Sequence, residues 1–482
     1  MNVVLYVLDA LRADHLSCYG YERETSPTID TLASDGVVFE QCFSPSTWTR
    51  PVAASLLTGS YPPTHDTQTR NDRFNPHVAP LAEQFRSAGY DTVGVTSMGN
   101  VSTSVGFDRG FDHFFDRYTD EEVIAKRRTS TVTDEELKQE QVEEVALPRA
   151  ADLTDAFSSW LDDRTSDDPF FGLFWAIDTH IPYDPPEEYR TFADSEYEGP
   201  ATGEREDLKN VESDRDLEQL RALYDGEIAY TDACIGDLIE RLREAGEFED
   251  TLFVVVGDHG DAFGEHGRLT HGHAPYDELI HVPCVMRTPE GTHLRDDSLC
   301  SLVDVYPTLL DYADVMSDPP DGVQGSSLAS ALSGDPVSEP AHEHVFSKTD
   351  SYDMQNTFYG VRSTDWKYIE IEEPDRGGRT LLQLVRYVFE KGIVFDILRN
   401  PRYYLDRYRY SETEFLYDLA TDPGETENIL EDRPEQAERL RTLLREWETE
   451  CTALGKRLEG GQTTGSIDEG TREQLRQLGY SE

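Results

Sequence analysis

Two apolar runs of this chain end directly in an aspartate, and this arrangement constrains the fold more than any other feature. Residues 3–8 run straight into Asp9, and residues 252–256 run through Gly257 into Asp258 and His259. Apolar runs of this length are typical of strands buried on both faces of a parallel sheet. In open α/β sheets, ligands bind just beyond the carboxyl ends of such strands. The two runs therefore predict a site where the two aspartates and the histidine meet.

Strand-like and helix-like segments alternate through the first two-thirds of the chain. This alternation predicts an α/β fold with a large, mainly parallel sheet flanked by helices on both faces. We expect strands at 3–8, 92–95, 170–177 and 252–256, and helices at 28–33, 80–87, 150–161 and 216–245. We expect them to form one α/β domain at 1–335, with polar insertions at 119–148 and 185–216.

The pattern changes after about residue 334. Alternating aromatic stretches at 358–361, 366–371 and 414–418 predict a small antiparallel sheet, and a helix is expected at 434–454. These elements define a C-terminal unit at 336–455. A linker and a short terminal helix are expected at 456–482.

The charge of the chain is strongly negative, with 96 acidic and 43 basic residues and a net charge of −53. Acids spread over the whole length suit a surface that stays hydrated at high salt, so we expect a cytoplasmic protein of a salt-loving organism. Nucleic acid and anionic membranes would be repelled. No apolar run is long enough to span a bilayer, and because a core strand is expected at 3–8 we expect no signal peptide. Six cysteines without CxxC spacing predict free thiols, and the oligomeric state is left open.

Asp9, Asp258 and His259 offer carboxylate and imidazole ligands at two strand ends. This mixture suits Mn²⁺, Mg²⁺ or Zn²⁺, while Ca²⁺ prefers oxygen ligands alone. We expect one divalent cation, Mn²⁺, Mg²⁺, Ca²⁺ or Zn²⁺, and leave a second one open. The alternative is a pair of strand-end caps that make only local hydrogen bonds.

Thr49 precedes a segment, 51–57, that can begin a helix with Pro51 in its first turn. The hydroxyl would then lie at a helix N-terminus, where backbone N–H groups can hold an anion. A hydroxyl becomes a competent nucleophile when a metal lowers its pKa, so Thr49 is expected both to attack and to bind the metal. The alternative is an ordinary N-cap.

The motifs together resemble the sulfatase family of the alkaline phosphatase superfamily, from Met1 to about Tyr480. They are Asp9, Thr49-x-Pro51, Leu56-Leu57-Thr58-Gly59, residues 106–112, His180-Ile181-Pro182-Tyr183, Gly257-Asp258-His259-Gly260, Gly264-Glu265-His266-Gly267, Tyr276-Asp277-Glu278, Leu416-Tyr417-Asp418-Leu419, Asp422-Pro423-Gly424-Glu425 and Leu478-Gly479-Tyr480. The resemblance implies a large α/β domain with a C-terminal antiparallel sheet.

The chain also departs from the family pattern. Thr49 stands where sulfatases carry the Cys that becomes formylglycine, and Ala53 stands at the position of the motif's Arg. Ala10 replaces the second Asp of the metal-binding pair, and His271 takes the place of a Lys. The set that is left consists of Asp9, Thr49, Asp258 and His259. It is similar to the site of superfamily members that transfer phosphoryl groups through a threonine, such as lipoteichoic-acid synthases and lipid A phosphoethanolamine transferases.

Five further residues are candidates for the site. His180, at the family's His-x-Pro position, could protonate the leaving oxygen, and a structural His beside a Pro is the alternative. His271 and His273 flank Gly272 and could stabilise anionic charge or ligate a second metal, or lie on a loop surface. Asn71 could donate to a phosphoryl oxygen and Arg12 could clamp the anion, or they are a turn Asn and a helix-surface Arg.

We therefore expect a metal-dependent ester hydrolase in which the metal binds the Thr49 alkoxide and one ester oxygen. Thr49 attacks a phosphate, phosphonate or sulfate ester in line, and His180 or His271 protonates the leaving group. The substrate is a small anionic ester, for which a glycan or a lipid head group is a candidate. The alternatives are a true sulfuric ester hydrolase, a phosphotransferase to an alcohol acceptor, and a non-catalytic relative that binds a metal or an anion.

Overall fold

The structure is a computed structural model, and it describes residues 1–117, 148–315, 320–334, 341–350, 356–373, 410 and 412–459. The expected insertion at 119–148 lies outside the described residues except for its last residue. The expected terminal helix and the Leu478-Gly479-Tyr480 motif also lie outside them.

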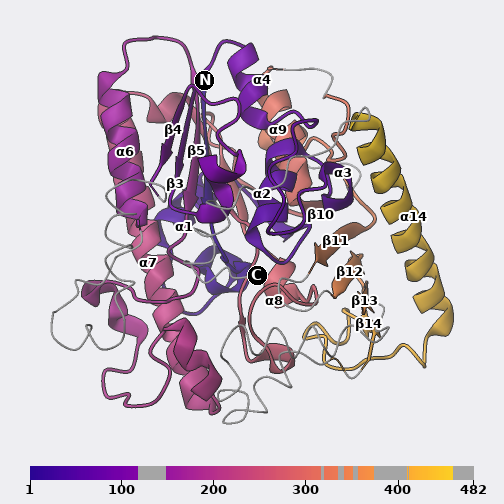
Figure 1. The fold of residues 1–482 in the computed structure, drawn as a ribbon. Helices are drawn as coiled ribbons and strands as arrows, with labels where there is room; N and C mark the ends of the chain where they lie inside the picture. The colour runs from indigo at the N-terminus through magenta and orange to yellow at the C-terminus, as the bar shows by residue number, and fades with distance from the viewer. Residues whose placement is uncertain are drawn as a thin grey trace.

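A twisted sheet forms the centre of the described part of the chain (Figure 1). Its eight strands lie in the order β10-β2-β9-β6-β1-β5-β3-β4, and only β9 runs antiparallel to its neighbours. The strands are β1 (Asn2–Leu8), β2 (Val37–Phe43), β3 (Asp91–Thr96), β4 (His113–Asp116), β5 (Phe170–Ala176), β6 (Thr251–Gly257), β9 (Cys284–Arg287) and β10 (Leu294–Ser301). The predicted mainly parallel sheet is confirmed.

Helices cover both faces of this sheet (Figure 1). One face carries α2 (Thr49–Thr58), α4 (Leu81–Ser87), α9 (Val305–Tyr312) and α10 (Ala329–Leu332). The other face carries α1 (Pro27–Ser34), α6 (Ala150–Asp163) and α7 (Asp214–Ala245). Along β1, Leu5 and Val7 pack on the first face, and Tyr6 and Leu8 pack on the second. Because both faces are buried, the strand reads as an unbroken apolar run in the sequence.

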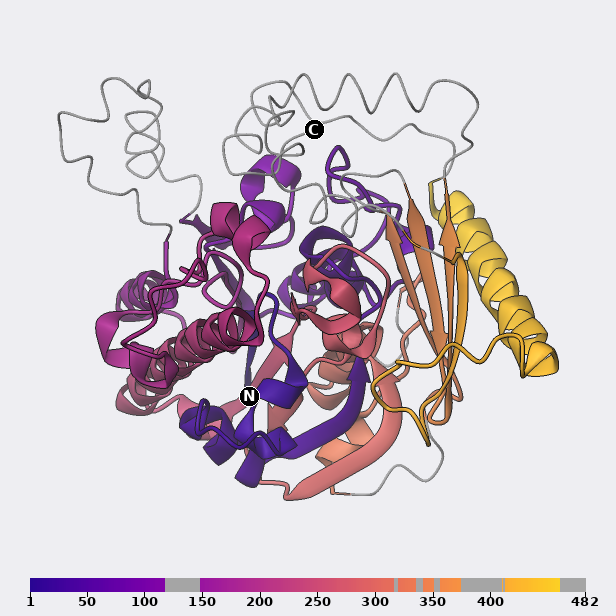
Figure 2. The ribbon, with the colours of Figure 1, turned by 90° about the horizontal axis from the view of Figure 1, so that it is seen from below.

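A second, antiparallel sheet lies to one side of the large one (Figure 2). Its order is β11 (Val345–Asp350), β12 (Thr357–Arg362), β13 (Trp366–Glu372) and β14 (Glu414–Asp418). The long helix α14 (Pro434–Leu458) packs on it through Leu440, Leu444 and Trp447. The sequence predicted this sheet and its helix, and it missed β11.

Short elements connect these layers. They are α3 (Pro62–His65), α8 (Asp277–Ile280), the hairpin of β7 (Ala262–Phe263) and β8 (Leu269–Thr270), and 3₁₀ helices that include η3 (Gly99–Val101), η5 (Glu187–Phe192) and η6 (Arg205–Asn210). The last two lie in the polar segment 185–216. All six cysteines are free thiols, as expected. None of the described helices combines the length and the apolar character needed to cross a lipid bilayer.

Candidate active site

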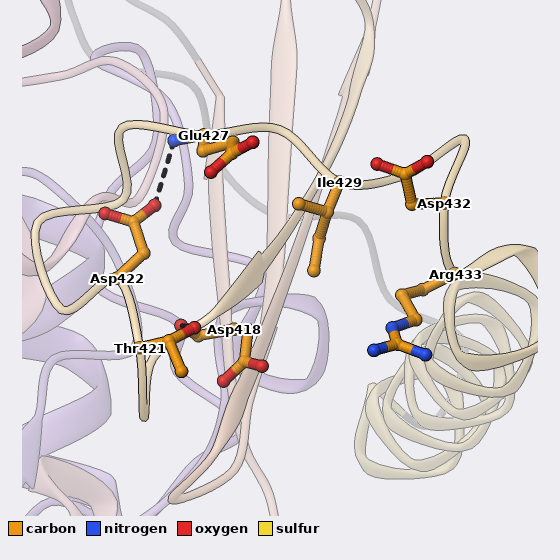
Figure 3. A pocket seen from close by; sticks show the side chains of 7 residues that line it. All are labelled: Asp418, Thr421, Asp422, Glu427, Ile429, Asp432 and Arg433. Atoms are coloured by element: carbon orange, nitrogen blue, oxygen red, sulfur yellow. Dashed lines mark hydrogen bonds between the residues drawn. The ribbon is translucent and has the colours of Figure 1, made fainter.

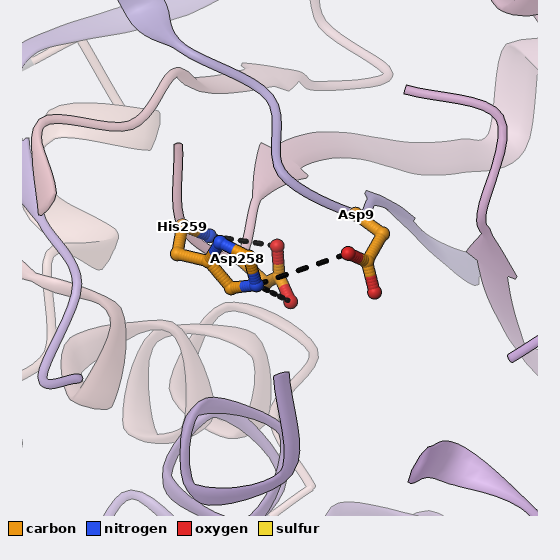
Figure 4. Close-up of side chains that lie close together, drawn as sticks. All are labelled: Asp9, Asp258 and His259. Carbon is orange, nitrogen blue, oxygen red and sulfur yellow. Dashed lines mark hydrogen bonds and ion pairs between the residues drawn. The ribbon is translucent and has the colours of Figure 1, made fainter. Parts of the chain in front are cut away.

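Neighbouring strand ends bring Asp9, Asp258 and His259 together (Figure 4). β1 and β6 are parallel neighbours with Leu8 opposite Gly257, so the residues after each strand emerge at the same edge of the sheet. The backbone N–H of Asp258 donates to the carbonyl of Leu8 at 3.3 Å, which extends the pairing one step past β6. All three side chains are fully buried.

The three side chains turn their unused polar atoms toward one another. Nε2 of His259 lies 3.8 Å from Oδ1 of Asp9 and 3.5 Å from Oδ2 of Asp258. Among the residues that the structure describes, neither of these two carboxylate oxygens has a hydrogen-bond partner. The other oxygen of Asp258 accepts from the backbone N–H groups of Ala10, at 2.8 Å, and of His259, at 2.7 Å. Buried acceptors without donors are costly, and a cation between them removes that cost.

The histidine is held in the form that a metal requires. Nδ1 of His259 lies 3.0 Å from the carbonyl oxygen of Gly260. A carbonyl can only accept, so Nδ1 carries the proton and Nε2 presents its lone pair to the carboxylates. One ligand atom from each of the three residues lies within 4.8 Å of the others. The residues therefore fit a divalent cation.

Electrostatics lead to the same conclusion. Burial raises the pKa of Asp258 to about 8. Burial, and then the charge of Asp258, raises the pKa of Asp9 well above its ordinary value. Two buried carboxylates that repel each other are stabilised as anions only by a nearby positive charge, which a divalent cation supplies.

Thr49 reaches the same point from a different element. It is the first residue of α2, whose N-cap is Trp48, so Thr49 is not the N-cap itself. Its hydroxyl donates to Oδ2 of Asp9 at 3.1 Å and lies 3.4 Å from Nε2 of His259. The fully buried Arg50 fixes this helix start by donating to the carbonyl of Asp72 at 3.1 Å, among other acceptors. The buried hydroxyl of Thr49 thus faces the cation ligands.

A row of imidazole rings extends from this cluster. The ring of His271 lies 4.5 Å from that of His259 and 4.9 Å from that of His180. Nδ1 of His180 lies 2.6 Å from the carbonyl of Ile181, so it carries the proton, and the buried Nε2 has no hydrogen-bond partner in the described part of the chain. Burial, and then the charge of His271, lowers the pKa of His180 well below its ordinary value. The ring of His180 is therefore neutral and presents an acceptor.

The sequence analysis missed Asp261, which orients His271. Its Oδ1 lies 2.5 Å from Nδ1 of His271, and its Oδ2 accepts from the hydroxyl of Tyr183 at 2.5 Å. The β7–β8 hairpin pairs Ala262 with Thr270. It therefore places Asp261, just before β7, beside His271, just after β8. The available signal was the position of Asp261 directly after Gly257-Asp258-His259-Gly260.

The structure places the remaining candidates in other contacts. The guanidinium of Arg12 forms ion pairs with Asp14 at 2.7 Å and Glu265 at 3.1 Å, which ties it to the loop after His259. Asn71 lies on an exposed turn, and its backbone N–H donates to the hydroxyl of Thr69. Nε2 of His273 lies 3.1 Å from the carbonyl of Thr270. None of these recorded contacts involves Asp9, Asp258 or His259.

The sequence model described as "Sulfatase" matches residues 1–315 of this chain. The chain belongs to the sulfatase family. A second model, described as "N-sulphoglucosamine sulphohydrolase, C-terminal", matches residues 264–376. Family membership identifies the chain as a hydrolase of ester bonds and agrees with a divalent metal at the site.

Similar proteins come from several sulfatase groups. An arylsulfatase of Clostridium perfringens is 27% identical over 375 residues, covering 68% of this chain and 77% of that protein. An N-acetylglucosamine-6-O-sulfatase of Bacteroides thetaiotaomicron is 22% identical over 450 residues, covering 76% of this chain and 78% of that protein.

Solved structures share the fold over nearly the whole chain. The phosphonate monoester hydrolase of Agrobacterium radiobacter superposes with a TM-score of 0.67 at 21% identity, covering 95% of this chain and 96% of that one. A protein solved with its substrate D-glucosamine-2-N,6-O-disulfate superposes with a TM-score of 0.68 at 19% identity, covering 94% of this chain and 98% of that one.

Within this sulfatase fold, the small sheet anchors the loop that carries His271. Lys367 of β13 is fully buried, and its Nζ lies 2.8 Å from Asp277 and 2.7 Å from Glu425. His266 lies 2.8 Å from Glu278, and its ring stacks on Tyr276 at 3.6 Å. Segments 264–281 and 412–425 are thereby joined around the buried ammonium group of Lys367.

A separate hollow lies between the end of β14 and the start of α14 (Figure 3). It is lined by Asp418, Thr421, Asp422, Glu427, Ile429, Asp432 and Arg433. Asp422 is occupied as the acceptor of the backbone N–H groups of Thr426 and Glu427, at 2.8 and 2.9 Å. This carboxylate stabilises a turn, and we assign the hollow no function.

Proposed function

We propose that the chain hydrolyses a phosphate or phosphonate ester by in-line attack of the Thr49 hydroxyl at a site for one divalent cation. The observation that carries the proposal is the position of that hydroxyl. It is buried, lies 3.1 Å from Asp9 and 3.4 Å from His259, and belongs to the first residue of a helix.

Asp9, Asp258 and His259 would hold the cation through their unpartnered oxygens and Nε2. When bound, the cation supplies Lewis acidity and neutralises negative charge on the nucleophile and the ester. Asp9 also accepts the hydrogen bond of the Thr49 hydroxyl, so it orients the hydroxyl and lies in position to take its proton as the new bond to the ester forms.

The start of α2 offers the second source of stabilisation. Backbone N–H groups in the first turn of a helix lack acceptors within the helix and favour an anion. Thr49 is the first residue of that turn, so an ester attacked by its hydroxyl lies next to these donors. They would stabilise the charge that builds on the equatorial oxygens of the transition state.

His271 is the better of the two expected proton donors. Asp261 accepts from its Nδ1 at 2.5 Å and stabilises a positive charge on the ring, so that Nε2 can deliver a proton to the leaving oxygen. His180 is buried with its pKa lowered, so it does not carry the proton that a general acid needs. We assign His180 the role of accepting a hydrogen bond from the substrate through Nε2.

The nucleophile favours phosphorus over sulfur. A threonine cannot be converted to formylglycine, which sheds sulfate by elimination from a hemiacetal. A threonine that has accepted a sulfate or phosphoryl group is instead released only when water attacks the transferred group. A phosphorylated threonine is a workable intermediate of this kind. A true sulfuric ester hydrolase is the second candidate, because the relatives from Clostridium perfringens and Bacteroides thetaiotaomicron carry the sulfatase name. An acceptor alcohol in place of water would make the chain a transferase.

The test is turnover by purified protein of an aryl phosphate, a phosphate diester, a phosphonate monoester and an aryl sulfate. Each is assayed with Mn²⁺, Mg²⁺, Ca²⁺ or Zn²⁺, comparing wild type with Thr49→Ala. Thr58→Ala is the matched control, because Thr58 lies at the other end of α2 and its hydroxyl donates to the Ala54 carbonyl within the same helix.

We expect cleavage of a phosphorus ester that Thr49→Ala lowers by about 10³-fold or more and Thr58→Ala leaves largely intact. Dominant, Thr49-dependent release of sulfate would establish the second candidate instead. Turnover at background level for every ester, with cation binding intact, would leave the non-catalytic binding relative as the better description.

A further inference from the structure

Arg205 stands in a segment that is fastened to the leaving-group side of the site. It is the first residue of η6, and its side chain is exposed. Just before it, the carbonyl of Gly203 accepts from the backbone N–H of Tyr183 at 3.0 Å. A Cβ on Gly203, whose φ is +93°, would lie 2.0 Å from the carbonyl oxygen of Tyr183. The backbone at 203 is therefore pressed against Tyr183, three residues beyond His180.

From Tyr183 a chain of contacts leads to the reacting centre. The hydroxyl of Tyr183 donates to Asp261, which accepts from His271. The positive charge of Arg205 also acts electrostatically on the site. It adds to the effects of burial and of His271 that lower the pKa of His180.

Arg205 differs from its basic neighbours in having its charge available. Arg190 forms an ion pair with Asp184, and Arg215 forms one with Asp194 at 2.7 Å. Within the described ranges, no carboxylate forms an ion pair with Arg205. The net charge of the chain is −53, so most of its surface repels anions, and an available guanidinium beside the site is a specific exception.

We propose that Arg205 binds a second anionic group on the leaving-group portion of the substrate. The reacting ester lies at Thr49, and the leaving group extends past His271 and His180 toward η6. A guanidinium binds a carboxylate or a similar oxyanion through two parallel hydrogen bonds. The preferred substrates are thus esters of an alcohol or phenol that carries its own negative charge. This inference rests on the proposed function, because it takes the ester to react at Thr49.

The test compares two aryl esters that differ in one charge. They are 3-carboxyphenyl phosphate and its carboxylate methyl ester, or the matching phosphonate or sulfate pair if the wild type prefers that class. The ratio of their kcat/KM values is measured for wild type, Arg205→Ala and Arg205→Glu. Lys209→Ala is the matched control, because it removes one positive charge from the last turn of the same short helix.

We expect wild type to prefer the carboxylate by about tenfold, the size of one charge-assisted interaction. The preference should vanish in Arg205→Ala, reverse in Arg205→Glu and persist in Lys209→Ala. An absence of preference in wild type, or the same preference in wild type and Arg205→Ala, would overturn the inference while leaving the hydrolase intact.

A second measurement separates this inference from the proposed function. Calorimetry with (3-carboxybenzyl)phosphonate and its carboxylate methyl ester needs no turnover. If no ester is cleaved but wild type binds the carboxylate form about tenfold more tightly in an Arg205-dependent manner, the hydrolase proposal fails and Arg205 remains an anion site. Equal binding of both forms by wild type would refute the role of Arg205.

Discussion

Replacing Asp258 by Asn should stabilise the cation-free protein while abolishing its response to divalent cations. In the cation-free fold the carboxylate is fully buried, and its pKa is raised to about 8 from an ordinary value near 3.8. The amide of Asn keeps the shape of the side chain. Its oxygen can still accept from the backbone N–H groups of Ala10 and His259. The substitution therefore removes the charge with little other change.

The magnitude follows from linkage. Between pH 4 and pH 8 the folded protein holds a proton on Asp258 that the unfolded chain has released, so stability falls as the pH rises through this window. At pH 7, about three units above the ordinary pKa of Asp258, this loss of stability amounts to about 4 kcal/mol. For a chain of 482 residues the unfolding entropy is about 1 kcal/mol/K, so the gain in Tm for Asp258→Asn is about 4 °C.

A cation acts in the opposite direction on the wild type. It requires both carboxylates as anions and stabilises the folded state by about 2.7 kcal/mol at a concentration 100 times its Kd. The assay is thermal unfolding of wild type and Asp258→Asn from pH 5 to pH 8, in chelator and with Mn²⁺ or Mg²⁺. The difference between the two proteins isolates this residue from other titrating groups. A lower Tm for Asp258→Asn in chelator, or a wild type that no divalent cation stabilises, would refute the reasoning.

Three further substitutions test other parts of the structure. Asp261→Asn leaves His271 without its carboxylate partner. In steady-state kinetics we expect kcat to fall by about 10²-fold for esters with poor leaving groups and by less for 4-nitrophenyl esters. Equal losses for both kinds of ester would contradict proton donation by His271. Ala10 holds a left-handed φ of +60°, so Ala10→Gly should raise the free energy of unfolding by about 1 kcal/mol in a denaturant titration. A loss of stability would contradict backbone strain at Ala10. Lys367→Met leaves the buried carboxylate of Glu425 without its ion-pair partner, while Asp277 keeps Arg362 at 3.2 Å, and it should lower the same free energy by about 3 kcal/mol. A neutral result would mean that this network contributes little.

Much of the large domain was predictable because its signals are local. The expected strands at 3–8, 170–177 and 252–256 correspond to β1, β5 and β6, and the expected helix at 216–245 corresponds to α7. Strands buried on both faces must be apolar at every position, and long amphipathic helices repeat their pattern over many residues. By contrast, β2, β9 and β10 were missed, and β10 has an irregular register and exposed positions.

The candidate site was predictable to the same extent. Asp9, Asp258 and His259 follow strands that were recognisable, and Thr49 begins a helix that Pro51 marked. The alternative of plain strand-end caps loses support, because one oxygen of each carboxylate is buried without a partner among the described residues. Arg12 was expected to clamp an anion, but its contacts in the structure are ion pairs with Asp14 and Glu265.

The sequence by itself determined which residues end the strands and which residue begins the helix, since the alternation of apolar and polar residues along a segment controls both. Only the tertiary structure decided that Asp261 serves His271, that Lys367 is buried between two carboxylates, and that the segment of Arg205 lies against Tyr183. These contacts join segments whose separation in the chain carries no periodic signal. They depend on how hairpins, loops and the second sheet pack around the strand ends, and this packing is a property of the whole fold.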